Sequence, residues 1–568
     1  MNWRLILRNG LLAGIIAFYL SAIGLTETFA QRYLIGKFLS MGQLFAAIGG
    51  ITAGILTARV LKKEEEKETT AYASSLLSGA ASSIPPLILI FLIEILVVQQ
   101  AGQDVIFNWR EMFVNFSPTL IDILTFGQGP VLGSILLVLA STILAGIGAA
   151  LVLLPSRSKV ALLNAFIWVI GMGFFSENVT QILNQLGGRF LIRFLFVQKT
   201  LNPIAAVIIF AGAFALAYYR VHTRVQNRWE SMSPAQKKQG SRVGIILGIL
   251  LLVLLPWMVG QFLSQALFLI GLYVMMGLGL NIVVGYAGLL DLGYVAFYAL
   301  GAYTMGILTS TGPLGQGNLN FWLALPIAIL VGVFFGLLLG FPVLRMRGDY
   351  LAIVTLGFGE IIRILATSDW LSSFEGGPQG ILHIPYPEFF GFAMNQPQTM
   401  YYLVIAGSLL AAFVTIRLRD SRLGRQWMAM REDEDVAEAM GINLVQTKLL
   451  AFAIGAGFSA LAGAIFAARL GNIFPHSFNL IVSINALALI IVGGLGSIPG
   501  VIVGSLILVG LPELLREFTE YRFLMYGVLL IVMMLFRPEG FLPEAAHRRE
   551  LRAGEEDFPD EELVTTEA

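Results

Sequence analysis

The chain consists of long apolar runs separated by short polar loops. Each run has about 17 to 25 predominantly apolar residues, enough for a helix to cross a bilayer. The pattern predicts about six such helices before residue 242 and about ten after it. The predicted spans are 10–29, 38–58, 79–99, 128–153, 160–175, 202–219, 243–259, 262–284, 291–310, 321–343, 349–367, 399–417, 448–470, 482–496, 499–515 and 523–537. We therefore expect an all-α, polytopic integral membrane protein with about sixteen transmembrane helices.

The first apolar run follows Arg4 and Arg8, a pattern that fits either a signal peptide ending near Ala30 or an uncleaved first span. The residues Thr28-Phe29-Ala30 form a poor cleavage site, which favours the uncleaved span.

Basic loops predict the orientation of the spans, because Lys and Arg concentrate in short cytoplasmic loops. The loops beginning at Arg59, Ser156 and Arg220 are rich in Lys or Arg and are expected inside. Segments 100–127 and 176–201 then lie outside, although the second contains Arg189, Arg193 and Lys199. In the second part, Arg345 with Arg347, the block 416–447 and Arg537 all fall on the cytoplasmic side.

The polar, basic stretch after the sixth span is the best domain boundary, since it has no long apolar face to bury. It predicts a membrane region at 1–220, a cytoplasmic linker at 221–242, a second membrane domain at 243–540 and a tail at 541–568. The tail is acidic and lacks a hydrophobic face, so we expect it to be disordered in the cytoplasm.

Composition supports the membrane class and excludes several others. The chain is 57% hydrophobic and 13% charged, with a net charge of zero, so no global field favours nucleic acid. It contains no cysteine and four histidines, none at ligand spacing with an acid, so we expect no metal and no cofactor. The nucleotide-binding pattern G-x-x-x-x-G-K-[ST] is absent, so any ATP hydrolysis must come from another chain.

A short helix is predicted at 432–441 in the largest cytoplasmic loop. Its acids suit the positive end of a helix dipole, and the glycine at its end suits a C-terminal cap. The helix is either a solvated connector or a docking helix received by a cytoplasmic partner. The candidate docking residues are Glu432, Glu434, Asp435, Ala437 and Gly441.

The stretch "GYAGLLDLGYVAFYALGAYT" at 285–304 predicts an interrupted helix. Gly285 and Gly288 break the span, Tyr286 is one of the tyrosines that line or frame the break, and the freed backbone groups need partners or a water-lined path. Asp291 can accept backbone N–H groups where the next helix begins, and it can also border a solute path.

Glu360 and Arg363 are the other ionisable residues within a span. Three positions apart, they share one face of a helix and can pair. The pair is either purely structural or lies beside the solute path, because charges in hydrocarbon normally face the bundle interior, a partner or water.

Six ordered segments resemble the permease subunits of branched-chain amino acid ABC importers over about 269–542. They are "GYAGLLDLGYVAFYALGAYT", "RGDYLAIVTLGFGEIIRIL", "DSRLGRQWMAMREDEDVAEAMGIN", "KLLAFAIGAGFSALAGAIFA", "ALIIVGGLGSIPG" and "LLIVMMLFRPEGF". Asp435 and Val436 depart from the Glu-Ala of the family's docking pattern E-A-A-x-x-x-G, and residues 1–242 greatly exceed the usual leader. That extra region is either an accessory membrane domain or a degenerate sister permease.

The resemblance implies an importer subunit in the cytoplasmic membrane of a prokaryote that works by alternating access. It implies cytoplasmic ABC ATPases as partners, a second permease subunit, an extracytoplasmic solute-binding protein and surrounding lipid. Related permeases carry urea or short-chain amides, so the solute class stays open between these and branched-chain amino acids. An ion-coupled secondary transporter using Asp291 and a membrane-embedded enzyme are the rival classes, and no convergent catalytic groups support the second.

Overall fold

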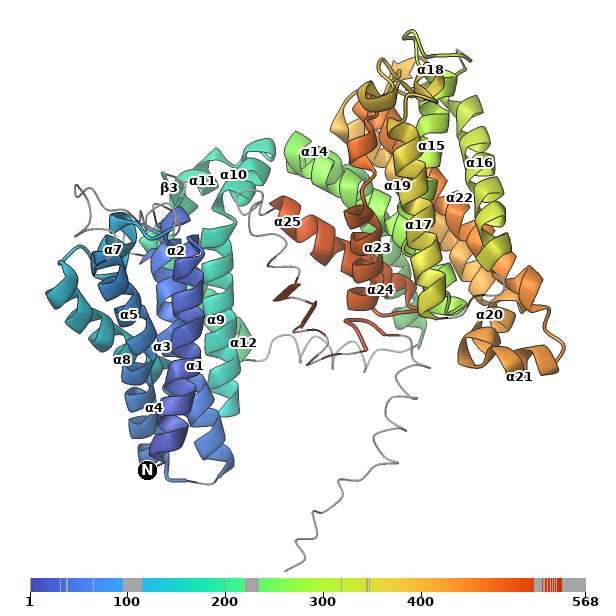
Figure 1. The fold of residues 1–568 in the computed structure, drawn as a ribbon. Coiled ribbons are helices and arrows are strands. Elements are labelled where there is room, and N and C mark those ends of the chain that lie inside the picture. Colours follow the sequence, from blue (N-terminus) through green and yellow to red (C-terminus); the bar gives the residue numbers. More distant parts are fainter. Residues whose placement is uncertain are drawn as a thin grey trace, which may run out of the picture. The chain divides into compact units, whose positions relative to one another are not determined.

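The chain folds into two compact units, Met1–Gly248 and Ile249–Ala568 (Figure 1). The structure, a computed structural model, describes residues 2–30, 32–36, 39–64, 66–95, 115–198, 200–219, 234–317, 319–343, 346, 348–514, 524, 527, 528, 530, 531, 533, 535, 537 and 539–543. Seven of the fifteen residues of the predicted span 523–537, residues 221–233 of the predicted linker and residues 544–568 of the predicted tail lie outside the described residues.

Eleven helices within the described residues are long and apolar enough to cross a membrane. Three shorter apolar helices accompany them, at Pro203–Tyr218, Val295–Thr309 and Ile498–Leu514. The predicted all-α, polytopic class is therefore confirmed, whereas the expected number of about sixteen spans is not.

The predicted spans 243–259 and 262–284 correspond to two helical stretches within α14 (Pro234–Leu280), which meet at a kink. Gly260 interrupts its regular geometry with φ +80° and ψ −176°. The Ser264 hydroxyl donates to the carbonyl oxygens of Gly260 at 2.6 Å and of Pro256 at 3.0 Å, close to the point where the proline removes a helical donor. The break falls where the sequence predicted a loop, but the chain continues as a helix on both sides.

The first unit is a bundle of long apolar helices with a small sheet. Its elements are α1 (Trp3–Ala22), α2 (Leu25–Thr28), β1 (Tyr33–Ile35), β2 (Leu39–Ser40), α3 (Met41–Lys63), α4 (Glu68–Ser82), α5 (Ile84–Ile93), α7 (Pro118–Leu124), α8 (Pro130–Leu153), α9 (Ser156–Phe174), α10 (Ser176–Gln185), α11 (Arg189–Leu195), β3 (Phe196–Val197), β4 (Thr200–Leu201) and α12 (Pro203–Tyr218). The strand order is β2-β1-β4-β3, with β1 and β4 parallel and the other pairs antiparallel.

Small residues bring α1, α3, α4 and α8 close together, as is usual for helices packed in a membrane (Figure 1). Gly54 of α3 lies against the backbone of Ala145 in α8, where a side chain would collide with the Ala145 carbonyl. Helix α3 begins with a reciprocal cap, in which Gln43 N donates to Ser40 Oγ at 3.2 Å and Ser40 N donates to Gln43 Oε1 at 3.0 Å.

The second unit contains the remaining helices and one hairpin. Its elements after α14 are a π-helical turn (Asn281–Tyr286), α15 (Val295–Thr309), α16 (Phe321–Val343), α17 (Asp349–Thr367), α18 (Ser372–Glu375), a 3₁₀ turn (Gly377–Gln379), β5 (Glu388–Phe389), β6 (Phe392–Ala393), α19 (Pro397–Arg419), α20 (Arg422–Glu432), α21 (Glu434–Ala439), α22 (Leu444–Leu470), a 3₁₀ turn (Pro475–Ser477), α23 (Leu480–Gly493), α24 (Ile498–Ser505), a π-helical turn (Leu506–Gly510) and α25 (Leu511–Leu514).

Helix α22 forms the centre of this second unit. Within its most apolar window, 78% of the residues are buried, the highest share of any candidate span in the described residues. It packs against α15 and α16 over most of its length, and also contacts α19, α20 and the π-helical turn. Helices α20 and α21 lie at the end of the unit opposite α18 (Figure 1).

Candidate functional site

The interruption predicted around Gly285 and Gly288 is present in the structure. Helix α14 loosens into the π-helical turn Asn281–Tyr286, and the next helix, α15, does not begin until Val295. Gly288 has φ +71°, a left-handed conformation that glycine adopts without cost. Tyr286, like the intervening Asp291, is buried. The second unit therefore contains a stretch of non-helical backbone inside its core.

Asp291 accepts a backbone N–H, although not at the start of the next helix as the sequence suggested. Its Oδ1 accepts from Gly293 N at 2.9 Å, and this bond closes a turn two residues before Val295. Helix α15 has no side-chain cap of its own. The second oxygen, Oδ2, makes no well-formed hydrogen bond within the described residues, although the Thr355 side chain is close enough to interact with the carboxylate. A buried acid so incompletely paired is costly and marks a candidate functional position.

Three hydrogen bonds between a side chain and a backbone N–H join the interrupted segment to other parts of the unit. Asn281 Oδ1 accepts from Gly496 N at 2.9 Å, and Thr355 Oγ1 in α17 accepts from Leu292 N at 3.0 Å. Ser483 Oγ in α23 accepts from Val295 N at 2.8 Å. The backbone N–H groups of Leu292 and Val295 are thus bonded to side chains of α17 and α23, as non-helical backbone within a membrane requires.

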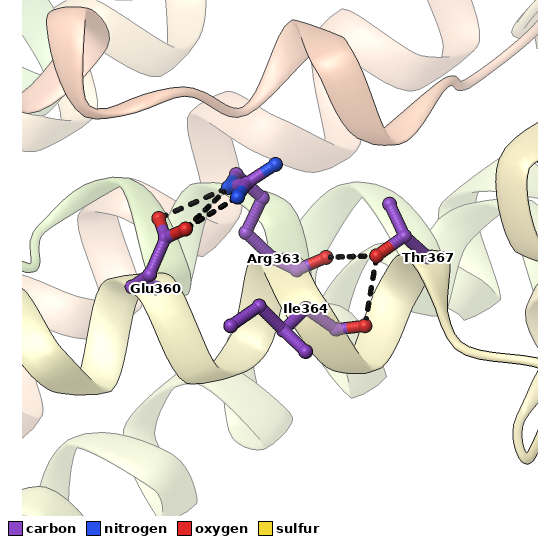
Figure 2. A network of polar contacts seen from close by, with 4 residues as sticks. All are labelled: Glu360, Arg363, Ile364 and Thr367. Atoms are coloured by element: carbon purple, nitrogen blue, oxygen red, sulfur yellow. Dashed lines mark hydrogen bonds and ion pairs between the residues drawn. The ribbon is translucent and has the colours of Figure 1, made fainter.

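Glu360 and Arg363 form the ion pair that their spacing predicted. Arg363 Nε donates to both carboxylate oxygens of Glu360 at 3.0 Å, and its Nη2 also contacts Oε1 (Figure 2). Their side chains are 45% and 38% exposed, respectively, so the described helices of the second unit cover the pair only in part. Two charges on the apolar helix α17 need a polar neighbour, water or another chain at this face.

A small cavity connects Glu360 with the interrupted segment. Its volume is about 20 Å³, which is room for a single water molecule. Glu360 is the charged residue in its lining, and the others are apolar side chains and one glycine: Leu292, Val295, Leu356, Gly359, Phe478 and Leu480. Leu292 follows Asp291 directly in the chain, but Asp291 itself does not line the cavity. Gly285 and Gly288 belong to the same break but do not line this cavity.

The predicted cytoplasmic helix is shorter than expected, since α21 spans only Glu434–Ala439. Glu432 belongs instead to the end of α20, because Asp433 acts as the N-cap of α21 and accepts from Asp435 N at 2.9 Å and Val436 N at 3.0 Å. Gly441, two residues after the last residue of α21, terminates the helix with φ +89°, as the glycine predicted. Gly441 N donates to Glu438 O at 2.9 Å and Ile442 N to Ala437 O at 3.0 Å, a Schellman motif.

Helix α21 has a buried side and an exposed apolar side. Ala437 is 3% exposed and faces its own unit, whereas Val436 and Met440 are 58% and 79% exposed. These two residues are four apart and share a face. The two side chains form a small apolar surface that the described part of the second unit leaves uncovered.

Several residues at these sites were not predicted as functional from the sequence. Asn281, Thr355 and Ser483 hold the break, and their signal was a single polar residue within an apolar run. Lys448 is 2% exposed and its Nζ lies 2.8 Å from Glu434 Oε2. Arg431, whose Nη1 donates to Gly285 O at 2.7 Å, gave no distinct signal because it precedes a run of acids in the sequence.

Comparison with known proteins agrees with these features of the second unit. Residues 262–536 match the family described as the permease component of the branched-chain amino acid transport system. The chain is 43% identical over 307 residues to the high-affinity branched-chain amino acid transport system permease protein LivM of Salmonella typhimurium strain LT2, covering 50% of this chain and 71% of that protein.

Two further relatives extend the likeness. LivM of Escherichia coli K12 is 42% identical over 322 residues, covering 53% of this chain and 74% of that protein. The permease protein LivH of the same strain is 26% identical over 290 residues, covering 48% of this chain and 91% of LivH. No solved structure matches the chain. These relatives are permease subunits and not enzymes, and with its multiple membrane-spanning helices this chain belongs to the family of permease components of branched-chain amino acid transport systems.

Proposed function

We propose that the chain is the permease subunit of an ATP-driven importer in the cytoplasmic membrane of a prokaryote. It moves branched-chain or closely related amino acids inward by alternating access. Cytoplasmic ABC ATPases hydrolyse the ATP, a second permease subunit completes the path, and an extracytoplasmic binding protein delivers the solute. The likeness to LivM supports this solute class over urea or short-chain amides.

The observation that carries the proposal is the exposed apolar face of α21. Val436 and Met440 project from a helix that is anchored to its own unit through Ala437 and Lys448. A solvated connector has no need for such a pair, whereas an ATPase groove can bury it. The acids Glu434 and Asp435 occupy the first turn of this helix, where they suit its dipole.

The region beside Glu360 supports the proposed solute path. Its apolar lining suits a branched aliphatic side chain, and the carboxylate of Glu360 suits an ammonium group. A cavity of about 20 Å³ is far too small for an amino acid, since ligand pockets usually have at least about 300 Å³. The helices around it must therefore separate during transport, as alternating access requires.

The docking role is tested by replacing Met440 with glutamate in the intact transporter. A charge at this position leaves α21 folded, because the side chain is 79% exposed, but it cannot be buried in an apolar groove. We expect M440E to abolish co-purification of the ATPase and ATP-dependent uptake. The control is Phe392→Glu, which also alters an exposed apolar residue but on the β5–β6 hairpin. Normal ATPase binding by M440E would exclude the docking role.

The solute class is tested by uptake into proteoliposomes that contain the purified transporter complex. We expect ATP-dependent uptake of leucine, isoleucine and valine, and no uptake of urea or acetamide. Uptake that proceeds without ATP but collapses when an ionophore dissipates the proton or sodium gradient would contradict the proposal and favour an ion-coupled transporter.

A further inference from the structure

Helix α20 reaches the interrupted helix through Arg431. A helix that ends leaves its last carbonyl groups without intrahelical donors, and these groups carry the negative end of the helix dipole. Arg431 Nη1 donates to the Gly285 carbonyl oxygen at 2.7 Å, at the end of the π-helical turn. A guanidinium suits this position because it supplies both a donor and a positive charge. Arg431 thus caps the first half of the interrupted helix.

The stem of Arg431 also packs against the break. A Cβ atom placed on Gly288 would lie 2.9 Å from Arg431 Cγ and 3.2 Å from its Cα. The backbone of α20 therefore passes directly beside the left-handed glycine. With one end of the side chain bonded to Gly285 and its stem against Gly288, the interrupted segment is in contact with α20 over several residues.

Helix α21 follows Arg431 within three residues and is fixed to α22 as well. Lys448 Nζ and Glu434 Oε2 are 2.8 Å apart, and the Lys448 side chain is 3% exposed. The fully buried Trp427 of α20 donates from Nε1 to Thr447 O at 2.8 Å. A displacement of α21 is therefore passed to both α20 and the first turn of α22, because neither contact can be broken cheaply in a buried setting.

The far side of the break is attached to α22. Tyr294 Oη donates to Gly455 O at 2.7 Å, and Ser459 Oγ donates to Tyr294 O at 3.1 Å. Gly455 and Ser459 lie two and three turns beyond Lys448 on the same helix. The segment between Gly285 and Tyr294 is thus held at one end by α20 and at the other by α22, and both helices are joined to α21.

We propose that Arg431 is a positioning residue that transmits the displacement of α21 to the interrupted helix at Gly285, and so couples ATPase movement to opening of the solute path. The inference rests on the proposed docking of an ATPase on α21. Arg431 does not touch the solute. Its bond to Gly285 moves the first half of the interrupted helix, while the Lys448–Glu434 pair holds α21 to α22.

The test compares solute uptake with ATP hydrolysis in the reconstituted transporter complex. We expect Arg431→Met to keep the ATPase bound and hydrolysing, while solute transported per ATP falls about tenfold or more, within the usual range of coupling between sites. Arg431→Lys retains a donor and should recover part of the ratio. The matched control is Arg425→Met on the same helix, because Arg425 is exposed and its Nη1 donates to Asp420 O in the adjacent turn.

A second measurement separates transmission from a purely structural cap. Hydrogen–deuterium exchange of residues 281–291 should change on ATP binding in the wild type and in R425M, but not in R431M. An unchanged transport ratio in R431M would overturn the inference, as would an equal loss of ATPase binding, hydrolysis and uptake. The wild-type complex tests the proposed function without any variant: solute uptake that consumes no ATP would contradict the importer itself, and not only the role of Arg431.

Discussion

At the scale of single residues, the second unit repeatedly buries one polar side chain in an apolar helix and gives it a distant backbone partner. Asn281, Ser483 and Thr355 each accept from a backbone N–H in another part of the unit. A buried polar group costs little only when it is bonded, so each such residue fixes one arrangement of its helices. Lys448 is the charged example, since its ammonium group is buried and paired with Glu434.

The Lys448–Glu434 pair predicts an unequal cost for losing either partner. Glu434→Ala leaves a buried ammonium without its carboxylate, so we expect a loss of about 3 kcal/mol, the usual cost of breaking a buried pair. Lys448→Met should cost less, because the Glu434 side chain is 19% exposed and can turn toward water. The double variant should recover much of the stability lost in E434A. Thermal unfolding of the purified protein measures all three, and additive losses would contradict a direct pairing.

At the scale of elements, α15 and α17 meet through a glycine where the interrupted helix resumes. A side chain on Gly293 would collide with the backbone carbonyl of Thr355. Gly359 lies close by, because a Cβ atom placed on Gly359 would be 3.2 Å from the Cα of Gly293. The chain can therefore bring the Thr355 hydroxyl close enough to accept from Leu292 N. The position of α17, and with it that of Glu360, depends on this close approach.

Two glycine-to-alanine substitutions, one at the close approach and one in open space on α17, distinguish the cost of overpacking from the general effect of replacing a glycine. Gly293→Ala must push α17 away from the break, and we expect a loss of about 1 to 3 kcal/mol in stability, as for other overpacked cores. Gly357→Ala, on the same α17 but with open space around it, should be neutral or slightly stabilising. Unfolding temperatures of the two purified variants give the comparison. Equal stability of G293A and G357A would show that the approach is not required.

At the scale of the whole molecule, the sequence predicted the class, the interruption and the ion pair, because each depends on local composition or spacing. Apolar runs indicate spans, and two charges three apart on a helix can pair whatever surrounds them. The number of spans was less predictable, because the apolar helices Pro203–Tyr218, Val295–Thr309 and Ile498–Leu514 are shorter than an ordinary span. The partners of Asp291, Arg431 and Lys448 could not be predicted, since these contacts join residues that only the folded chain brings together. Glu432 was misplaced because Asp433 begins α21, and neighbouring acids look alike in a sequence.

The orientation of each unit can be tested with single cysteines, because the chain has none of its own. Between Lys63 and Leu186, the described residues contain the three long apolar helices Glu68–Ile93, Pro130–Leu153 and Arg157–Phe174, an odd number, so we expect these two residues on opposite sides of the membrane. Between Phe392 and Glu438 stands the single long helix α19, which gives the same expectation.

In intact cells, a membrane-impermeant maleimide should label Leu186→Cys and Phe392→Cys at once. Lys63→Cys and Glu438→Cys should react only after the membrane is opened, because the basic loops near them are expected in the cytoplasm. All four residues are exposed, so access depends on the side of the membrane and not on burial. Labelling of Leu186→Cys only in opened cells would move Arg189 and Arg193 to the cytoplasm. The first unit would then follow the rule for basic residues, and the number of crossings between Lys63 and Leu186 would have to be even.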